Sequence, residues 1–149
     1  MRKFQLVKDE FRKHENSILP TRATENSAGY DFITPVEIRI EPNSTSDLIF
    51  TDVKACMESD ELLMLHIRSS IGMKKNLALA NTTGIIDSDY YENPDNDGNI
   101  GFKLRNLSDK TVVINKGEKI VQGIFIKYLT TDDDQTTTSR TGGFGSSGK

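Results

Sequence analysis

The chain has very little of what would make it a disulfide-bonded, metal-clustered or membrane protein. Its 149 residues include one cysteine and no tryptophan. A lone Cys56 can form neither an internal disulfide nor a cysteine-based metal site. No apolar run approaches the roughly 20 residues that a membrane helix needs, and residues 1–5 do not begin the apolar stretch of a signal peptide. We therefore expect a cytoplasmic location and no membrane partner.

An excess of positive charge is also missing. The 19 Lys and Arg residues are outnumbered by 22 Asp and Glu residues, which gives a formal net charge of −3. Proteins that bind nucleic acids usually carry a basic face, so we expect no nucleic-acid partner. A small anionic substrate remains compatible with this composition, because a few local cations are enough to bind it.

The apolar residues follow the period of strands and not that of long helices. Strand-like alternation of side chains recurs over 36–40, 63–67 and 112–114. Only one turn after Ser69 has the apolar period of a helix. Short strands at a spacing of roughly 8–12 residues are typical of an all-β sandwich or barrel. The longest run, Lys119–Ile126, predicts a central strand.

A change of composition divides the chain near residue 130. We expect residues 1–129 to form one β-domain, because residues 130–149 hold no branched aliphatic side chain and cannot bury enough surface to fold alone. A frayed terminus is the ordinary interpretation of such a tail. A single Arg140 and a single Phe144 within a Gly/Ser-rich segment also fit a lid that closes over a ligand.

The stretch 79–90 holds the first candidate for an active site. A buried strand over 77–79 is followed by a turn, and a second apolar pair then leads into Asp87. β-branched residues would hold the Asp87 carboxylate in a fixed direction, and Gly84 would let the backbone approach a flat ligand. The alternative is a surface hairpin whose Asn and Asp residues only form the turn.

A second candidate is the segment Arg68–Gly72, of sequence Arg-Ser-Ser-Ile-Gly. An arginine offers a planar fork of donors for phosphate oxygens, and two serine hydroxyls at a helix start add further donors. The alternative is a helix cap beside a surface arginine. Gln122, within the longest apolar run, is either a satisfied core amide or a site residue, and Asp31 is either a turn residue or a second acid of the site.

The two histidines offer no metal site. Neither His14 nor His66 has the neighbours and spacing of a protein-bound zinc, and His66 alternates with apolar residues as an outward-facing strand residue does. What remains is a phosphate-binding segment, an isolated Asp, aromatic side chains and a Gly/Ser lid. That set fits hydrolysis of a nucleoside polyphosphate by water.

Five segments, in order, resemble the five motifs of the homotrimeric deoxyuridine triphosphatases (dUTPases), in particular those of Gram-positive bacteria and their phages. The likeness extends over nearly the whole chain. The segments are Ala28–Phe32, Arg68–Gly72, Gly84–Tyr90, Gly117–Gln122 and Arg140–Gly148.

The resemblance implies a jelly-roll-like β-barrel and a homotrimer with a flexible C-terminal arm. It implies that motifs one, two and four of each site come from one subunit, motif three from a neighbour and the arm from the third subunit. The sequence departs from the family pattern in three places. These are an insertion over 92–97, four positions in place of five between Arg140 and Phe144, and Gly123 in place of a bulky apolar residue.

Carried over by position, the resemblance also implies roles for individual residues. Asp87 contacts the 3′-hydroxyl and orients the attacking water, and Asp31 binds Mg²⁺ through water. Tyr90 lies against the deoxyribose, Phe144 stacks on the uracil and Arg140 reaches the γ-phosphate. Substrate contacts are implied for Arg68, Ser69, Ser70, Asn81, Gly84, Ile85, Ile86, Tyr90, Gly101, Gln122, Arg140, Phe144, Gly145 and Ser146.

The function implied is hydrolysis of dUTP to dUMP and pyrophosphate, which keeps uracil out of DNA and supplies dUMP for dTTP synthesis. A dCTP deaminase of the same fold is the alternative enzyme, and ammonia release would distinguish it. A non-catalytic β-sandwich used for binding or regulation is the alternative of a different class.

Overall fold

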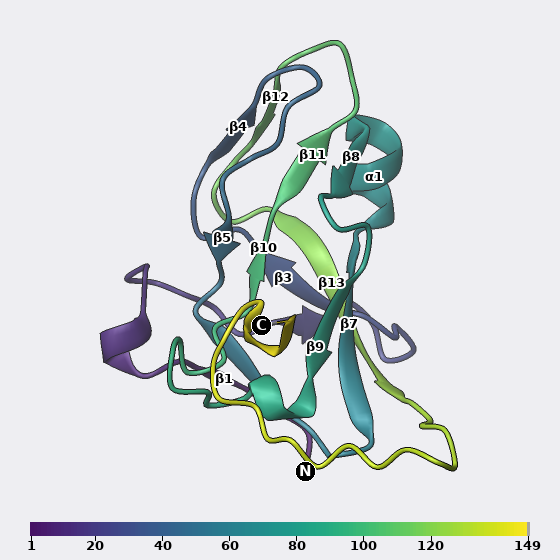
Figure 1. Ribbon diagram of the computed structural model, residues 1–149. Coiled ribbons are helices and arrows are strands. Elements are labelled where there is room, and N and C mark those ends of the chain that lie inside the picture. Colours follow the sequence, from purple (N-terminus) through teal and green to yellow (C-terminus); the bar gives the residue numbers. More distant parts are fainter. Residues whose placement is uncertain (149) are drawn as a thin grey trace.

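The computed structural model describes residues 1–148, and most of its regular structure is β-strand (Figure 1). All sheet pairs are antiparallel. The elements are β1 (Lys3–Leu6), η1 (Asp9–Phe11), β2 (Thr21–Arg22), β3 (Tyr30–Ile33), β4 (Ile38–Ile40), β5 (Ile49–Phe50), β6 (Val53–Cys56), β7 (Glu61–Ile67), α1 (Ser69–Lys75), β8 (Leu77–Leu79), β9 (Gly84–Asp87), η2 (Ser88–Tyr90), β10 (Gly101–Phe102), β11 (Leu104–Asn106), β12 (Val112–Ile114), β13 (Lys119–Lys127) and η3 (Ser146–Gly148).

The largest sheet has five strands, in the order β2-β3-β13-β7-β9. Four two-stranded sheets complete the fold, namely β1-β6, β10-β5, β11-β8 and β12-β4. The nine-residue β13 lies at the centre of the five-stranded sheet, which confirms the central strand expected over 119–126. The expected helical turn after Ser69 is α1, and Asn76, which caps its end, has the left-handed conformation with φ of 53°. The all-β prediction is confirmed.

The inner face of the five-stranded sheet forms part of the core. Residues opposite one another on neighbouring strands point to the same face, and Phe125 lies opposite Leu63 on this inner face. Leu63 is fully buried. Gly123 fits here because an added Cβ would lie 3.0 Å from side-chain atoms of both Leu63 and Phe32. This departure from the family pattern therefore has a packing reason.

The outer face of the same sheet is apolar yet partly open to solvent. Met64 lies between Ile85 of β9 and Ile124 of β13, and Leu62 lies opposite Ile126. The exposed fractions of Ile85 and Ile126 are 49% and 37%. A sheet face of this kind is typical of a surface that another protein chain covers.

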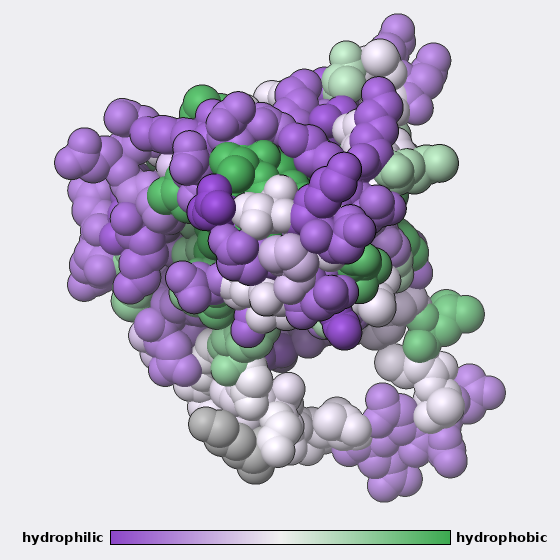
Figure 2. All heavy atoms as spheres, turned by 90° about the horizontal axis from the view of Figure 1, so that it is seen from above, coloured by the Kyte–Doolittle hydropathy of each residue, from purple (hydrophilic) through white to green (hydrophobic). Residues whose placement is uncertain are grey.

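The segment after β13 leaves the sheet. Residues 130–139 are exposed and contain no strand, and the chain then returns to lie near β9 and β10 (Figure 1). Figure 2 shows this segment as an arch with open space between it and the main body. The division of the chain near residue 130 remains a prediction. Among residues 1–148, no helix has the length and apolar character needed to cross a membrane.

Candidate active site

The strands β8 and β9 frame a pocket of about 440 Å³. β8 pairs with β11 and β9 pairs with β7, so the two strands do not form the surface hairpin that was the alternative interpretation of this stretch. The space between them is open, and the arm closes one side of it. Six residues assigned to the substrate line this pocket, namely Asn81, Gly84, Ile85, Ile86, Gly101 and Phe144.

The two glycines of the pocket allow close packing of the protein itself. A Cβ on Gly84 would lie 3.0 Å from the Cβ of Leu65, and a Cβ on Gly101 would lie 3.2 Å from side-chain carbons of Leu48 and Phe50. Phe144 stands at the mouth with an exposed fraction of 67%. A flat apolar ring inserted between Phe144 and the strands would cover that exposed aromatic side chain.

Asp87 lies where β9 ends, and its side chain is 55% exposed. Its Oδ2 accepts a hydrogen bond of 2.8 Å from Nη2 of Arg140, whose Nε donates to Oδ1 of Asp89 at 2.8 Å. The hydrogen bond to Asp89 raises the pKa of Arg140. Arg140, expected at a γ-phosphate, is therefore paired with two carboxylates of its own chain.

The arm lies against Asp87 and the pocket of the described chain. Arg140 finds two carboxylate partners there, and Phe144 lines the largely apolar pocket. Which subunit of a trimer the arm serves stays a prediction. Beyond Phe144, Gly145 has φ of +73° and Ser146 begins η3. The buried Oγ of Ser146 has no hydrogen-bond partner within residues 1–148, and its predicted contact with substrate stays a prediction.

Tyr90 is a fixed, uncharged ring beside these groups. It is buried, its hydroxyl donates to the Asn99 carbonyl at 2.8 Å, and the same hydroxyl accepts from Nδ2 of Asn96 at 2.8 Å. Burial raises the pKa of Tyr90. The Arg140 guanidinium lies 5.7 Å from the ring centroid. The predicted role of Tyr90 against a sugar remains a prediction.

A separate group of polar side chains lies at the other end of the sheet. Nε of Arg68 lies 2.9 Å from Oδ1 of the buried Asp31, and Gln122 is opposite Asp31 in the sheet. A Cβ on Gly29 would collide with Oε1 of Gln122, so this glycine makes room for the amide. Asp31 lies within β3, which excludes the alternative that it is a turn residue.

The start of α1 extends this group. Arg68 immediately precedes the helix, and Ser69 and Ser70 form its exposed first turn. The structure thus brings together Arg68, Ser69, Ser70 and Gln122, the residues predicted to bind phosphates, beside Asp31, which was predicted to hold Mg²⁺ through water. These roles stay predictions.

Sequence reasoning left His66 out of this group. His66 lies opposite Gln122, so it shares the outer face of the sheet with Gln122 and Asp31. Alternation along one strand indicates that His66 points outward, but only the pairing of β7 with β13 reveals its neighbours.

The two groups lie far apart in the described chain. Asp87 is opposite Leu62 of β7, whereas Arg68 lies six residues after Leu62 in the sequence, just beyond the end of that strand. At the usual rise of a strand this separation is about 20 Å.

The side chains around Asp31 can be compared with the ligands that Mg²⁺ prefers. Among residues 1–148, no three His, Cys, Asp or Glu side chains gather as a metal site. Asp31 is a single buried carboxylate beside Arg68 and Lys119, whose Nζ lies 3.7 Å from Oδ2. Mg²⁺ is commonly held by one or two carboxylates together with substrate phosphates, so this arrangement fits a metal that arrives with its substrate.

Comparison with known proteins agrees with the geometry. The family of dUTPases matches residues 15–148. The chain belongs to the dUTPase family. The deoxyuridine 5′-triphosphate nucleotidohydrolase of Lactococcus lactis is 47% identical over 132 residues, which cover 87% of each chain. That of Helicobacter pylori (strain Shi470) is 30% identical over 140 residues, or 91% of this chain and 92% of the relative.

Solved dUTPase structures share the fold. The dUTPase of Streptococcus mutans superposes with a TM-score of 0.76 at 41% identity, covering 87% of this chain and 98% of that one. The dUTPase of Staphylococcus aureus phage phi11 has a TM-score of 0.70 at 22% identity and supports the fold alone. The expected jelly-roll-like dUTPase fold is confirmed.

Proposed function

We propose that this protein hydrolyses dUTP to dUMP and pyrophosphate in the cytoplasm, which keeps uracil out of DNA and supplies dUMP for dTTP synthesis. The observation that carries the proposal is the 47% identity to a named dUTP nucleotidohydrolase over most of both chains. The pocket between β8 and β9 supports it independently, because the residues that line it match those expected around uracil.

The pocket selects the base and the sugar. Asn81 and the backbone at Ile85 and Ile86 read the edge of the uracil, while Phe144 stacks on its face. Tyr90 packs on the deoxyribose and leaves no room for a 2′-hydroxyl. Its buried, doubly hydrogen-bonded hydroxyl supports this role, because a ring that cannot move excludes a larger sugar by volume.

Asp87 orients the water that attacks the α-phosphorus in line, and it also contacts the 3′-hydroxyl. In the described chain Oδ2 of Asp87 is bound to Arg140. A guanidinium binds phosphate oxygens as readily as carboxylates, and its contacts with the largely exposed Asp87 and Asp89 are weakened by solvent. Arg140 therefore transfers to the γ-phosphate when dUTP binds, which frees Asp87 to act on the water.

Arg68, Ser69, Ser70 and Gln122 bind the phosphates. Members of the dUTPase family use a divalent metal ion, and Mg²⁺ is proposed here with Asp31 as its indirect ligand through water. When bound, Mg²⁺ neutralises charge on the phosphate oxygens.

A homotrimer brings the two halves of the site together. The roughly 20 Å between Asp87 and Arg68 supports a site shared between subunits, and the apolar outer face that includes Met64, Ile124 and Ile126 supports their association. In this assembly, the pocket and Asp87 of one subunit face the Arg68 group of its neighbour.

Pyrophosphate release from dUTP, UTP, dCTP and the other deoxynucleoside triphosphates tests the proposal. We expect efficient turnover of dUTP alone. Ammonia release from dCTP would identify the deaminase alternative. If a correctly folded trimer turned over none of these nucleotides, the non-catalytic binding protein would be the remaining alternative.

A further inference from the structure

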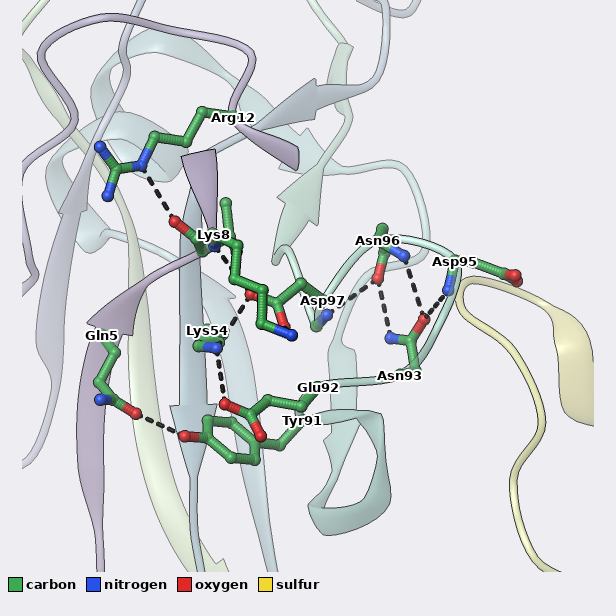
Figure 3. A network of polar contacts seen from close by, with 12 residues as sticks. Gln5, Lys8, Arg12, Lys54, Tyr91, Glu92, Asn93, Asp95, Asn96 and Asp97 are labelled. Carbon is green, nitrogen blue, oxygen red and sulfur yellow. Dashed lines mark hydrogen bonds and ion pairs between the residues drawn. The ribbon is translucent and has the colours of Figure 1, made fainter. Parts of the chain in front are cut away.

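Two segments in which the sequence departs from the family pattern touch each other. The N–H of Gly143 in the arm donates to Oδ2 of Asp95 in the inserted loop, at 2.7 Å. Figure 3 shows the arm passing directly beside Asp95. Gly142 and Gly143 are buried although they belong to an otherwise exposed tail, so the loop and the arm form a packed contact.

The fit depends on the absence of side chains in the arm. A Cβ on Gly142 would lie 2.6 Å from Oδ2 of Asp95, closer than real Cβ atoms come to other atoms. A Cβ on Gly143 would lie 3.1 Å from Oδ1 of Asn93 and from Nδ2 of Asn96. The two glycines thus let the arm lie against the loop, as close backbone approach requires.

The loop is held by contacts that do not involve the arm. Oδ1 of Asn93 accepts hydrogen bonds from the N–H groups of Asp95 and Asn96, at 3.0 and 3.2 Å. Nζ of the buried Lys54 lies 2.9 Å from Oδ2 of Asp97 and 2.8 Å from Oε1 of Glu92 (Figure 3). The backbone of Asp95 is thus held in place by Asn93, so the loop loses little conformational freedom when the Asp95 carboxylate binds the arm.

The same loop holds Tyr90. Nδ2 of Asn93 donates to the Tyr90 carbonyl at 2.8 Å, and Nδ2 of Asn96 donates to the Tyr90 hydroxyl at 2.8 Å. One rigid element therefore contacts both the aromatic ring assigned to the sugar and the arm that carries Arg140 and Phe144.

We propose that the inserted loop 92–97 is the docking site of the C-terminal arm and that Asp95 is a positioning residue for the reaction. By holding Gly143 it sets Phe144 over the pocket and Arg140 beside Asp87. Ordering each residue of a free arm costs roughly 1–2 kcal/mol, and the loop offsets part of that cost. The inference rests on the proposed dUTP hydrolysis and adds a determinant of lid closure to it.

Enzyme kinetics test the positioning role. Asp95→Ala removes the acceptor, Asp95→Asn keeps a neutral one, and Asp109→Ala is the matched control. Asp109 lies in the exposed turn between β11 and β12, at the far end of the molecule from the arm (Figure 1). We expect Asp95→Ala to raise KM for dUTP about three- to tenfold, which corresponds to the loss of one net hydrogen bond. Asp95→Asn should recover most of this loss, and Asp109→Ala should match the wild type.

A double-mutant cycle separates a docking role from a merely structural one. In a chain truncated after Ser139, Asp95 has no arm to hold, so Asp95→Ala should leave the residual activity unchanged. An equal loss in the full-length and truncated chains would overturn the proposal, as would a full-length Asp95→Ala enzyme with unchanged KM.

Trypsin gives a readout that does not depend on hydrolysis. Cleavage after Arg140 releases residues 141–149, and the side chain of Arg140 is only 11% exposed in the docked arm. Asp95→Ala should speed release of this fragment, followed by mass spectrometry without nucleotide, at least threefold over Asp109→Ala. Equal rates would contradict docking even in an inactive protein, whereas failure of the wild type to hydrolyse dUTP would contradict only the proposed function.

Discussion

At the scale of single residues, Asp87 and Asp89 form a natural comparison. Both carboxylates bind Arg140 at 2.8 Å and both are more than half exposed, but only Asp87 is proposed to act on water. Asp87→Asn should lower kcat for dUTP by about 10²–10⁴, while Asp89→Asn should change it less than tenfold. Pyrophosphate release measures both. Equal effects of the two substitutions would mean that these residues serve only to hold Arg140.

Asp52 is a buried carboxylate that stabilises the fold. It is fully buried and accepts hydrogen bonds from the N–H groups of Lys13 and His14, at 2.9 and 2.8 Å, and from Nδ2 of Asn99 at 3.0 Å. Asp52→Ala leaves these donors unpaired and should lower the free energy of unfolding by about 2–4 kcal/mol in urea denaturation.

Two further substitutions control that experiment. Asp52 has φ of 61°, which Asn tolerates better than Ala, so Asp52→Asn should lose less stability than Asp52→Ala. Asp47 is exposed, and Asp47→Ala should change the free energy of unfolding by less than about 0.5 kcal/mol. Equal stability of the Asp52→Ala and Asp47→Ala proteins would contradict the role given to Asp52.

At the scale of elements, the loop 92–97 should respond to acid through Glu92. The hydrogen bond from Lys54 lowers the pKa of Glu92, against the opposing effect of burial. A lowered pKa in the folded state means that this contact stabilises the loop above the ordinary pKa of a glutamate, about 4.3. The stabilisation is lost as the pH falls through the lower, folded value.

Glu92→Gln isolates this contribution. Wild type should be more stable than the variant near neutral pH, and the difference should shrink as the pH falls below about 4. Urea denaturation over a pH series measures this difference in the free energy of unfolding. The difference should be small because the Glu92 side chain is 47% exposed. A difference independent of pH would mean that the charge of Glu92 does not support the loop.

At the scale of the whole molecule, the outer face of the five-stranded sheet should form the contact between subunits. Ile126→Glu places a charge on this face and should convert the trimer to monomers and abolish turnover. Val113→Glu is matched to it, because Val113 is 38% exposed and Ile126 37%, yet Val113 lies on β12 outside that sheet. Light scattering after size exclusion measures both, and a trimeric Ile126→Glu protein would contradict this interface.

Mixed trimers determine which subunit the arm serves. A chain that lacks residues 140–149 keeps Asp87 without an arm, and an Asp87→Asn chain keeps the arm without the base. Because the resemblance implies an arm that serves a neighbouring subunit, verified mixed trimers should regain some dUTP hydrolysis. No recovery would mean that the arm closes over its own subunit, with Arg140 beside Asp87 of the same chain.

The sequence by itself determined the strands and the identities of the residues that carry the chemistry. Alternation of apolar side chains identified the central strand over 119–126 and the buried strand over 77–79, because the two-residue period of a strand is a local property. The order and spacing of five short segments identified the family. The insertion over 92–97, recognised against the family pattern, contains no helix or strand in the structure.

Only the tertiary structure decided which of these segments meet. The two-residue period of apolar side chains shows which face of a strand is buried, but it does not show which other strand lies beside it. For that reason the sequence left open a hairpin over 77–87, a turn at Asp31 and an isolated His66. The contact between Asp95 and Gly143 joins residues 48 positions apart, and such pairs are chosen by long-range packing, which leaves no pattern within either segment.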